Sequence, residues 1–427
     1  MEALADSPAV LIQGPRQCGK TTLAQTIGAS EGYQYFTFDD EGTRSYATED
    51  PLGFVKTLPE RAILDEAQLA PKLFPSIKLS IDNDRTAGRF ILTGSVNLLQ
   101  MTSIKESLAG RMDIVRLHPF SQNELERTAP RFLDSLFSSD KSSGNILEFR
   151  VGDPGPGGEV EKEEYFYTRK GVVAFDGRRQ NGIIERVVAG GYPTALRRAP
   201  TRRANWYQTY IEALIERDAS IIAEIHSLDT LSRLLELAAA RTAQLLSVNG
   251  LASSFQLNRL TIRNYLTLLE KMFLLERIPP WHSNHLKRLV KTPKMHLCDT
   301  GVICALLNLN ASSLSAKRPL FGQILETFVL QELKRQASAH QQRHTFHHFR
   351  DRYGIEVDIV IQRGALAVAG IEVKASSTVV NSNFKGLRKL QEALGETFAG
   401  GVLLYTGDRV MAFGDKRYAV PLESLWT

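Results

Sequence analysis

The first 120 residues alternate between short apolar runs and longer stretches with helical periodicity. Five of the short runs are predicted to be strands: Val10 to Gln13, Gln34 to Phe38, Ala62 to Leu64, Phe90 to Leu92 and Ile114 to Leu117. Buried strands that alternate with helices are typical of a parallel sheet covered on both faces. The pattern therefore predicts an α/β domain with a parallel sheet over residues 1–125.

The pattern changes after residue 120. Residues 126–195 include Ser135 to Gly144 and Val151 to Glu164, which lack apolar periodicity and are interpreted as surface loops or an insertion. Residues 196–300 are mainly helical, and residues 301–427 return to mixed α and β structure. The last strands are expected at Ile355 to Ile361, Ala367 to Val373 and Gly401 to Tyr405.

Composition places the chain among ordinary folded proteins. Its 427 residues are 43% hydrophobic and 23% charged, which excludes disordered and fibrous classes. Three cysteines without a Cys-x-x-Cys pair support neither a disulfide framework nor a zinc ribbon. The net charge of +5 permits a polyanionic partner without requiring one. The chain starts with the acidic sequence Met-Glu-Ala-Leu-Ala-Asp, and it lacks an apolar run of about 18 residues. These two features predict a cytoplasmic protein without a membrane span.

Residues 14–21 read Gly-Pro-Arg-Gln-Cys-Gly-Lys-Thr, which fits the phosphate-binding pattern G-x-x-x-x-G-K-[ST]. They lie between the first predicted strand and a helix that begins near Lys20, where backbone N–H groups can face phosphate oxygens. Lys20 is expected to reach the β and γ phosphates, and the Thr21 hydroxyl to bind Mg²⁺. The alternative is a chance glycine turn. The predicted ATP-binding residues are Gly14, Pro15, Arg16, Gln17, Cys18, Gly19, Lys20, Thr21 and Thr22.

Further polar groups follow at the ends of later strands. Asp65 is expected to complete the magnesium shell and Glu66 to act as general base, although a strand that ends in acids is also common as a solvated end. Ser95 or Thr93 would sense the γ-phosphate or position water, or would simply form a turn. Arg111 would supply positive charge to the transition state, in cis or from a neighbouring subunit of a homo-oligomer, or would lie on the surface.

The helical middle has the order of a winged helix: a helix-turn-helix core over residues 233–275 and a strand near Met295. On the helix Thr261 to Leu275, one face is apolar and the other is polar. The apolar face holds Ile262, Tyr265, Leu266, Leu269, Met272 and Phe273, and the polar face holds Arg263, Asn264, Thr267 and Lys271. This polar face and the basic segments Arg197 to Arg203 and Lys287 to Lys294 favour DNA binding. The alternatives are a lid, a protein contact or a solvated face.

Two predicted strands near the C-terminal end carry ionisable residues. Asp358 lies on the first, opposite its apolar face, and Glu372 and Lys374 share a face of the second. The spacing Asp-x(13)-Glu-x-Lys resembles the PD-(D/E)xK nuclease core, in which two carboxylates bind Mg²⁺ and the lysine positions or activates water. Glu326, on an apolar helical face, is expected to join this metal site. The alternative is a salt-bridged sheet that keeps the fold without cleaving DNA.

Several motifs together resemble one family. They are Gly-Pro-Arg-Gln-Cys-Gly-Lys-Thr-Thr-Leu, Leu-Asp-Glu-Ala-Gln, Leu-Thr-Gly-Ser, Leu-Ala-Gly-Arg, Gly-Gly-Tyr-Pro and Gly-Gln-Ile-Leu-Glu. The sequence resembles prokaryotic AAA-type ATPases whose C-terminal half is a conserved domain of unknown function. The resemblance covers nearly the whole chain except residues 131–185, which look longer and richer in glycine than usual.

The expected organisation is an AAA-type P-loop core (1–125), a lid or insertion (126–195), a winged-helix region (196–300) and a mixed α/β nuclease-like domain (301–427). We expect a magnesium-dependent ATPase whose hydrolysis drives or gates a winged-helix and nuclease-like module that acts on DNA, with DNA cleavage left open. The alternative is an ATP-gated regulatory or partner-binding switch with an inactive nuclease-like fold. The histidines at positions 340–348 are interpreted as solvated loop residues.

Overall fold

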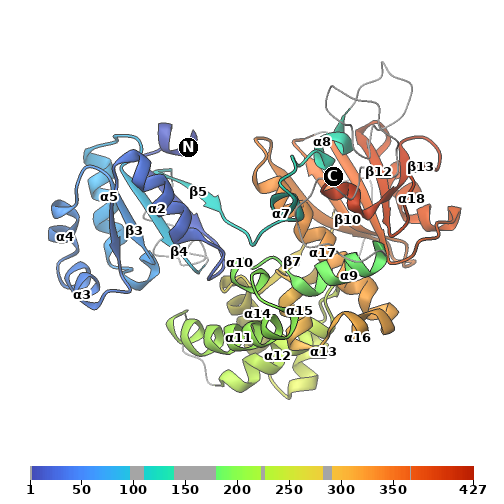
Figure 1. The fold of residues 1–427 in the computed structure, drawn as a ribbon, viewed down its shortest axis with the longest axis horizontal. Coiled ribbons are helices and arrows are strands. Elements are labelled where there is room, and N and C mark those ends of the chain that lie inside the picture. Colours follow the sequence, from blue (N-terminus) through green and yellow to red (C-terminus); the bar gives the residue numbers. More distant parts are fainter. Residues whose placement is uncertain (1, 97–109, 139–178, 223–226, 282–290, 366) are drawn as a thin grey trace.

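The computed structural model describes residues 2–96, 110–138, 179–222, 227–281, 291–365 and 367–427. An N-terminal α/β domain is joined by an extended segment to a larger body, which contains the helical middle and the C-terminal sheet (Figure 1). Within these described ranges, no helix combines the length and the apolarity needed to cross a membrane.

The N-terminal domain is built on a five-stranded sheet in which every pairing is parallel, as predicted. Its order is β2-β3-β4-β1-β5, so β4 lies between the strand that precedes the P-loop and the strand that ends in Asp65. The strands are β1 (Ala9–Gln13), β2 (Gln34–Thr37), β3 (Ala62–Asp65), β4 (Phe90–Gly94) and β5 (Met112–Arg116). The carboxyl ends of these parallel strands therefore meet at one edge of the sheet.

Helices cover both faces of this sheet (Figure 1). The helices are α1 (Glu2–Asp6), α2 (Lys20–Glu31), α3 (Glu41–Glu49), α4 (Pro51–Thr57) and α5 (Leu73–Asn83). One apolar core includes Phe54 of α4 and Ile77 of α5, and a smaller one on the other face includes Ala24 of α2. The central strands β1, β3 and β4 are therefore buried on both faces, whereas the edge strands β2 and β5 are partly exposed.

The middle of the chain is helical with a small antiparallel sheet of order β6-β8-β7. Its elements are α9 (Arg179–Ala189), α10 (Pro193–Leu196), α11 (Pro200–Ile222), α12 (Leu228–Ala240), β6 (Gln244–Leu245), α13 (Val248–Phe255), α14 (Arg259–Lys271), β7 (Leu275–Ile278) and β8 (Lys294–Leu297). The first helix of the predicted helix-turn-helix core ends at Ala240, and Gln244 and Leu245 pair with β8.

The C-terminal part contains a mixed six-stranded sheet of order β13-β14-β12-β11-β10-β9, which confirms the predicted mixed α/β architecture. Its elements are α15 (Thr300–Leu306), α16 (Ala311–Ala316), α17 (Arg318–Ser338), β9 (His344–Arg350), β10 (Glu356–Arg363), β11 (Ala367–Lys374), α18 (Lys385–Leu394), β12 (Phe398–Tyr405), β13 (Met411–Ala412) and β14 (Arg417–Pro421). Strands β9, β10 and β11 pair antiparallel, and β11, β12 and β14 pair parallel.

Two predicted loops are instead ordered parts of this body. Residues 344–350 form strand β9, because they pair with β10, and His348 is buried with its Nε2 3.0 Å from the carbonyl oxygen of Thr292. Residues 132–137 form helix α8, whose apolar side chains Phe132, Leu133, Leu136 and Phe137 are buried. The interpretation of 135–144 as a surface loop is therefore wrong for its first three residues; residues 139–178 lie outside the described part.

One apolar core runs through the middle and C-terminal parts of the chain. It includes Leu235 of α12, Leu266 of α14, Phe328 of α17 and Ile371 of β11. A second core on the other face of the C-terminal sheet includes Leu387 of α18. The regions predicted as separate units, 196–300 and 301–427, thus share their main hydrophobic core.

Candidate functional site

The P-loop turns from β1 into α2 at the carboxyl edge of the N-terminal sheet. Gly19 precedes the helix with φ 104°, a left-handed conformation that favours glycine, and no side chain caps the helix start. Gly14 is required for a different reason: a Cβ at this position would lie 2.1 Å from the carbonyl oxygen of Leu117. The local geometry thus leaves the first backbone N–H groups of α2 at the sheet edge, where helix dipole and donors favour an anion.

Lys20 and Thr21 begin α2 and lie beside the end of β3. The buried ammonium of Lys20 donates a hydrogen bond to the carbonyl oxygen of Pro15 in the same loop, at 2.9 Å. The Thr21 hydroxyl donates to Oδ1 of Asp65 at 2.9 Å. The structure therefore brings together the lysine, hydroxyl and carboxylate that the sequence predicts for phosphate and magnesium.

Asp65 accepts two further hydrogen bonds from neighbouring strands. Thr93 of β4 donates to Oδ1 at 2.6 Å, and Tyr35 of β2 donates to Oδ2 at 2.8 Å. Burial, followed by the carboxylate of Asp65, raises the pKa of Tyr35 to about 12, so the phenol remains a donor. Tyr35 was not predicted from the sequence, because its role follows from the position of β2 next to β3.

Glu66 is held by two polar side chains. The Ser95 hydroxyl donates to Oε2 of Glu66 at 2.9 Å. The Gln68 amide donates to the same Glu66 oxygen and also to Ser95 Oγ, the latter at 3.0 Å. Glu66 itself adopts φ 55°, and its backbone N–H donates to the hydroxyl of Thr93 at 3.0 Å. A non-glycine residue in this left-handed region is uncommon and is frequently found at functional sites. The contact of Gln68 with Glu66 was also not predicted from the sequence, although Gln68 belongs to the Leu-Asp-Glu-Ala-Gln motif.

Arg111 lies at the opposite edge of the sheet. Its guanidinium donates to Asp82 of α5 through Nε at 2.6 Å and Nη2 at 3.1 Å. Since β5 runs beside β1 from Met112 to Arg116, the P-loop lies a full strand away, roughly 15 Å at about 3.3 Å per residue. This position does not fit the predicted role in cis, and a role in trans within a homo-oligomer stays a prediction.

The remaining P-loop residues connect the loop to other elements. The carbonyl oxygen of Arg16 accepts a hydrogen bond from Tyr210 of α11 at 3.2 Å, and the Cys18 thiol lies 3.7 Å from the carbonyl oxygen of Leu117. Burial raises the pKa of the Cys18 thiol. Gln17 and Thr22 are exposed. The loop thus contacts both the helical middle and the segment that follows β5.

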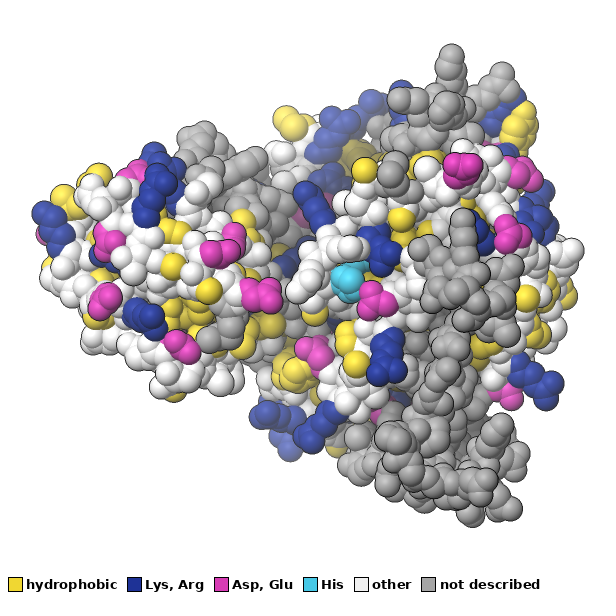
Figure 2. All heavy atoms as spheres, turned by 90° about the horizontal axis from the view of Figure 1, so that it is seen from above, with side chains coloured by type: hydrophobic (Ala, Val, Ile, Leu, Met, Phe, Trp, Pro, Cys, Tyr) yellow, Lys and Arg dark blue, Asp and Glu magenta, His cyan; other side chains and the backbone are white. Residues whose placement is uncertain are grey.

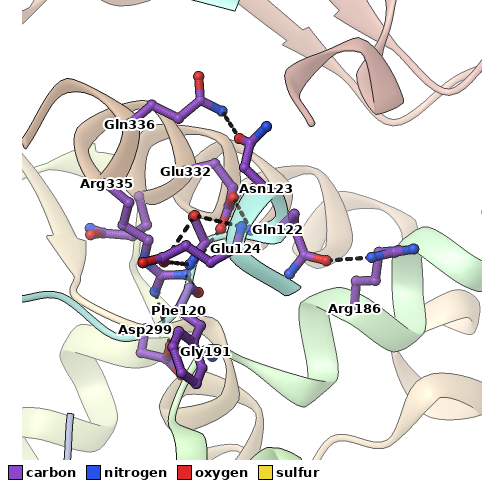
Figure 3. A network of polar contacts seen from close by, with 12 residues as sticks. Phe120, Gln122, Asn123, Glu124, Arg186, Gly191, Asp299, Glu332, Arg335 and Gln336 are labelled. Atoms are coloured by element: carbon purple, nitrogen blue, oxygen red, sulfur yellow. Dashed lines mark hydrogen bonds and ion pairs between the residues drawn. The ribbon is translucent and has the colours of Figure 1, made fainter. Parts of the chain in front are cut away.

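A buried polar network joins the segment after β5 to the C-terminal body (Figure 3). Arg335 of α17 donates to Phe120 O at 2.8 Å, Glu332 Oε1 at 3.0 Å and Asp299 Oδ2 at 3.1 Å. The same Asp299 oxygen accepts from Gly191 N at 2.8 Å. A helix, α7 (Gln122–Glu126), starts here, and its first backbone N–H donates to Glu332 at 2.7 Å. The side chains of Asp299, Glu332 and Arg335 are all buried, and the positive charge of the arginine compensates the negative charges of the two acids.

The predicted C-terminal metal ligands pair with two lysines, although Asp358 and Glu372 lie on neighbouring strands and Asp358 Oδ2 accepts a hydrogen bond from Val373 N at 3.0 Å. Lys294 of β8 places its ammonium 2.7 Å from Glu326 Oε1 and 3.4 Å from Asp358 Oδ1. Lys374 lies 3.6 Å from Glu372 Oε2. Among the described residues, no hydrogen bond or ion pair joins the Glu372 side chain to Lys294 or its two acids, and no set of three His, Cys, Asp or Glu side chains is arranged to hold a metal. The arrangement therefore does not form the predicted magnesium site of Glu326, Asp358 and Glu372.

The strand that carries Asp358 contains a β-bulge. The register of β10 against β9 shifts between Val357 and Val360, and both valines face the core under α18. Ile359 faces the other core, so the strict alternation predicted for this strand is broken beside Asp358. Glu372 lies close to Gly386 of α18, where an added Cβ would be 2.5 Å from its Oε1. Asp358, by contrast, accepts a hydrogen bond from the backbone N–H of Val373 on β11, the residue after Glu372.

Burial and mutual repulsion perturb these acids. Burial and then the charge of Asp358 raise the pKa of Glu326 to about 8, and the same two causes raise the pKa of Glu372 well above its usual range. Burial alone would lower the pKa of Lys294, but the carboxylates of Glu326 and Asp358 outweigh it and raise this pKa. The group therefore favours a charged lysine.

The predicted basic segments are only partly exposed. Lys294 is buried in the group just described, and Arg203 donates to the carbonyl oxygens of Ala195 and Arg198. Lys291 is exposed, whereas residues 287 and 288 lie outside the described part. On the N-terminal domain in Figure 2, basic and acidic side chains are interspersed on the visible face.

On α14, Arg263 and Asn264 are exposed, Thr267 and Lys271 are partly buried, and the predicted apolar stripe is buried.

Family models match three successive parts of the chain. Residues 6–126 match an AAA domain, residues 180–313 match a domain of unknown function (DUF8612), and residues 321–425 match another domain of unknown function (DUF4143). The uncharacterised proteins Mb2031c of Mycobacterium bovis and Rv2008c of Mycobacterium tuberculosis are each 26% identical to the chain over 427 residues. The aligned region is all of this chain and 82% of each relative.

Solved structures resemble the chain more distantly. The Walker-type ATPase PABY2304 of Pyrococcus abyssi is 17% identical with a TM-score of 0.43, over 72% of this chain and 93% of that one. The RuvB Holliday junction branch migration motor of Thermotoga maritima is 15% identical with a TM-score of 0.26, over 64% and 82%. The AAA model, the P-loop and the parallel sheet agree: residues 6–126 form a P-loop ATPase domain of the AAA type.

Proposed function

We propose that the protein hydrolyses ATP with Mg²⁺ at the carboxyl edge of its N-terminal sheet. The observation that carries this proposal is the 2.9 Å contact between the Thr21 hydroxyl of the P-loop and the Asp65 carboxylate, with Lys20 and Glu66 beside it. The residues of this arrangement come from strands β2, β3 and β4 and from helix α2. It contains each group that P-loop hydrolysis needs: a phosphate cradle, metal ligands and a base.

The residues fit a nucleotide and a magnesium ion. The uncapped start of α2 offers backbone N–H donors to phosphate, and Lys20 adds a positive charge. Thr21 and Asp65 would hold Mg²⁺, which when bound would neutralise charge on the phosphate oxygens. Glu66 would accept the proton of the attacking water, while Ser95 and Gln68 hold its carboxylate in place.

Lys20→Ala is expected to weaken ATP binding by about tenfold to a hundredfold. The reason is the loss of one charge-assisted contact to phosphate, worth about 1.5–3 kcal/mol. Titration with a fluorescent ATP analogue in the presence of Mg²⁺ measures the change. Lys56→Ala is the matched control, because Lys56 is an exposed lysine of the same domain. Equal affinities of the two variants for the analogue would contradict the phosphate-binding role.

A DNA-binding function of the middle region is our second proposal. The element order α12, β6, α13, α14, β7, β8 is the helix, strand, helix, helix, strand, strand order of a winged helix. Helix α14 buries its apolar stripe and exposes Arg263 and Asn264, which suit guanine or phosphate and adenine. These exposed side chains favour DNA over a purely structural role. DNA cleavage is not part of this proposal, because Lys294 lies between two of the required carboxylates.

Arg263→Ala is expected to weaken binding to a duplex of about 25 base pairs by roughly fivefold to a hundredfold, the effect of one lost base or phosphate contact of about 1–3 kcal/mol. If the contact is to phosphate, the salt dependence of binding also falls by about one ion. Fluorescence anisotropy over a range of salt concentrations measures both effects. Lys56→Ala removes one exposed charge from a different domain and is the control. A wild-type protein without salt-dependent DNA binding would refute the proposal.

A further inference from the structure

We infer that the Lys294 ammonium takes the place of the divalent cation in the C-terminal carboxylate centre, so that this centre works as a structural lock and binds no metal. The inference concerns residues 294, 326 and 358 and is independent of ATP hydrolysis. Its starting point is the position of the ammonium between two acids that the nuclease resemblance would assign to magnesium.

The backbone fixes the position of Lys294. It is the first residue of β8, the central strand of the small sheet, and pairs with Leu245 on one side and Ile278 on the other. Its side chain is only 5% exposed. From there the ammonium contacts Glu326 of α17 at 2.7 Å and Asp358 of β10 at 3.4 Å. A lysine anchored on both sides has little freedom to leave this centre.

A metal ion and this ammonium cannot share the centre. Magnesium requires oxygen ligands at about 2.0–2.1 Å in octahedral geometry, and a positive charge already lies within hydrogen-bond distance of Glu326. Two positive charges only a few ångströms apart in a buried site would repel strongly. The third predicted ligand, Glu372, is paired with Lys374 instead. While the Lys294 ammonium occupies this position, the centre therefore does not fit a metal ion.

The lock also joins two parts of the chain that different family models match. Lys294 belongs to the part at 180–313, whereas Glu326 and Asp358 belong to the part at 321–425. His296, two residues further along β8, extends the junction, because its Nδ1 lies 3.0 Å from the hydroxyl of Thr327 on α17. The centre thus fastens β8 to the C-terminal sheet at a place where a nuclease would need an open metal site.

The test counts Mn²⁺ bound to the full-length protein by electron paramagnetic resonance, without nucleotide. The N-terminal site is the same in every variant, so only differences between variants matter. Wild type and Glu326→Gln are expected to bind the same number of ions. One ion more in wild type than in Glu326→Gln would overturn the inference.

Lys294→Met provides the second comparison, with Lys291→Met as a control that removes an exposed lysine of the same segment. Lys294→Met is expected to gain one Mn²⁺ ion and to show a higher melting temperature when Mn²⁺ is added. Lys291→Met should match wild type in both measurements. A folded Lys294→Met protein that gains no ion would contradict the inference. If Lys294→Met does not fold, the comparison of wild type with Glu326→Gln decides alone.

Discussion

Glu66→Gln is expected to lower the rate of ATP hydrolysis by about 10²–10⁴-fold while ATP still binds. This range is the usual contribution of a general base, and glutamine keeps the shape of glutamate but cannot accept the proton of water. Ser95 and Gln68 hold the glutamate side chain, so the substitution changes its chemistry more than its surroundings. Phosphate release measures turnover, and titration with a fluorescent ATP analogue measures binding.

The control for this experiment is Glu60→Gln, an exposed glutamate of the same domain. It is expected to hydrolyse ATP at the wild-type rate. If Glu66→Gln retains the full rate, another group activates the water, and the assignment of Glu66 is wrong. If it loses ATP binding together with turnover, the substitution has disturbed the site as a whole, and the assignment to the chemical step is again contradicted.

Arg335→Ala is expected to destabilise the middle and C-terminal body by about 3–5 kcal/mol. The substitution leaves Glu332 and Asp299 buried without their shared cation, and uncompensated buried charges carry costs of this size. It also removes the donor to the carbonyl oxygen of Phe120. Burial raises the pKa of Glu332, and the charge of Arg335 acts against this shift.

Urea unfolding followed by tryptophan fluorescence measures this effect in the relevant part of the protein. All three tryptophans, Trp206, Trp281 and Trp426, lie outside the AAA-type domain. Arg318→Ala, which removes an exposed arginine from the same helix, is the control and should change stability by less than about 0.5 kcal/mol. A similar small change in Arg335→Ala would mean that the network contributes little to stability.

The nucleotide site was the part most accessible to sequence reasoning. Lys20, Thr21, Asp65 and Glu66 belong to motifs that are local in sequence, and a parallel sheet brings its carboxyl ends to one edge. Tyr35 and Gln68 have equally close contacts there, but Tyr35 lies outside the motifs and Gln68 had no role assigned within its motif. Their roles depend on which strand neighbours β3 and on the turn that follows Glu66, neither of which spacing reveals.

Burial and strand direction place other side chains away from their predicted positions, while a role of Arg111 in trans stays a prediction. Arg111 stands in a suggestive motif, yet it precedes a strand that runs parallel to β1 and therefore begins at the edge far from the phosphates. Lys294 counts as one more basic residue in a charged segment, but it is buried against two acids. The bulge between Val357 and Val360 breaks an alternation that looks regular in the sequence.

The segment between the P-loop contact and the buried arginine is a short tether. Leu117 touches the P-loop at Gly14 and Cys18, and Phe120 is bonded on both sides, to Gly191 and to Arg335 (Figure 3). Only His118 and Pro119 lie between Leu117 and Phe120. The Cα atoms of Leu117 and Phe120 are three residues apart in sequence and can therefore be separated by at most about 11 Å. The tether therefore keeps the phosphate-binding edge of the N-terminal domain within a short length of chain of Phe120 and, through Arg335, of α17. Cleavage of the backbone between residues 117 and 121 would therefore disrupt this connection.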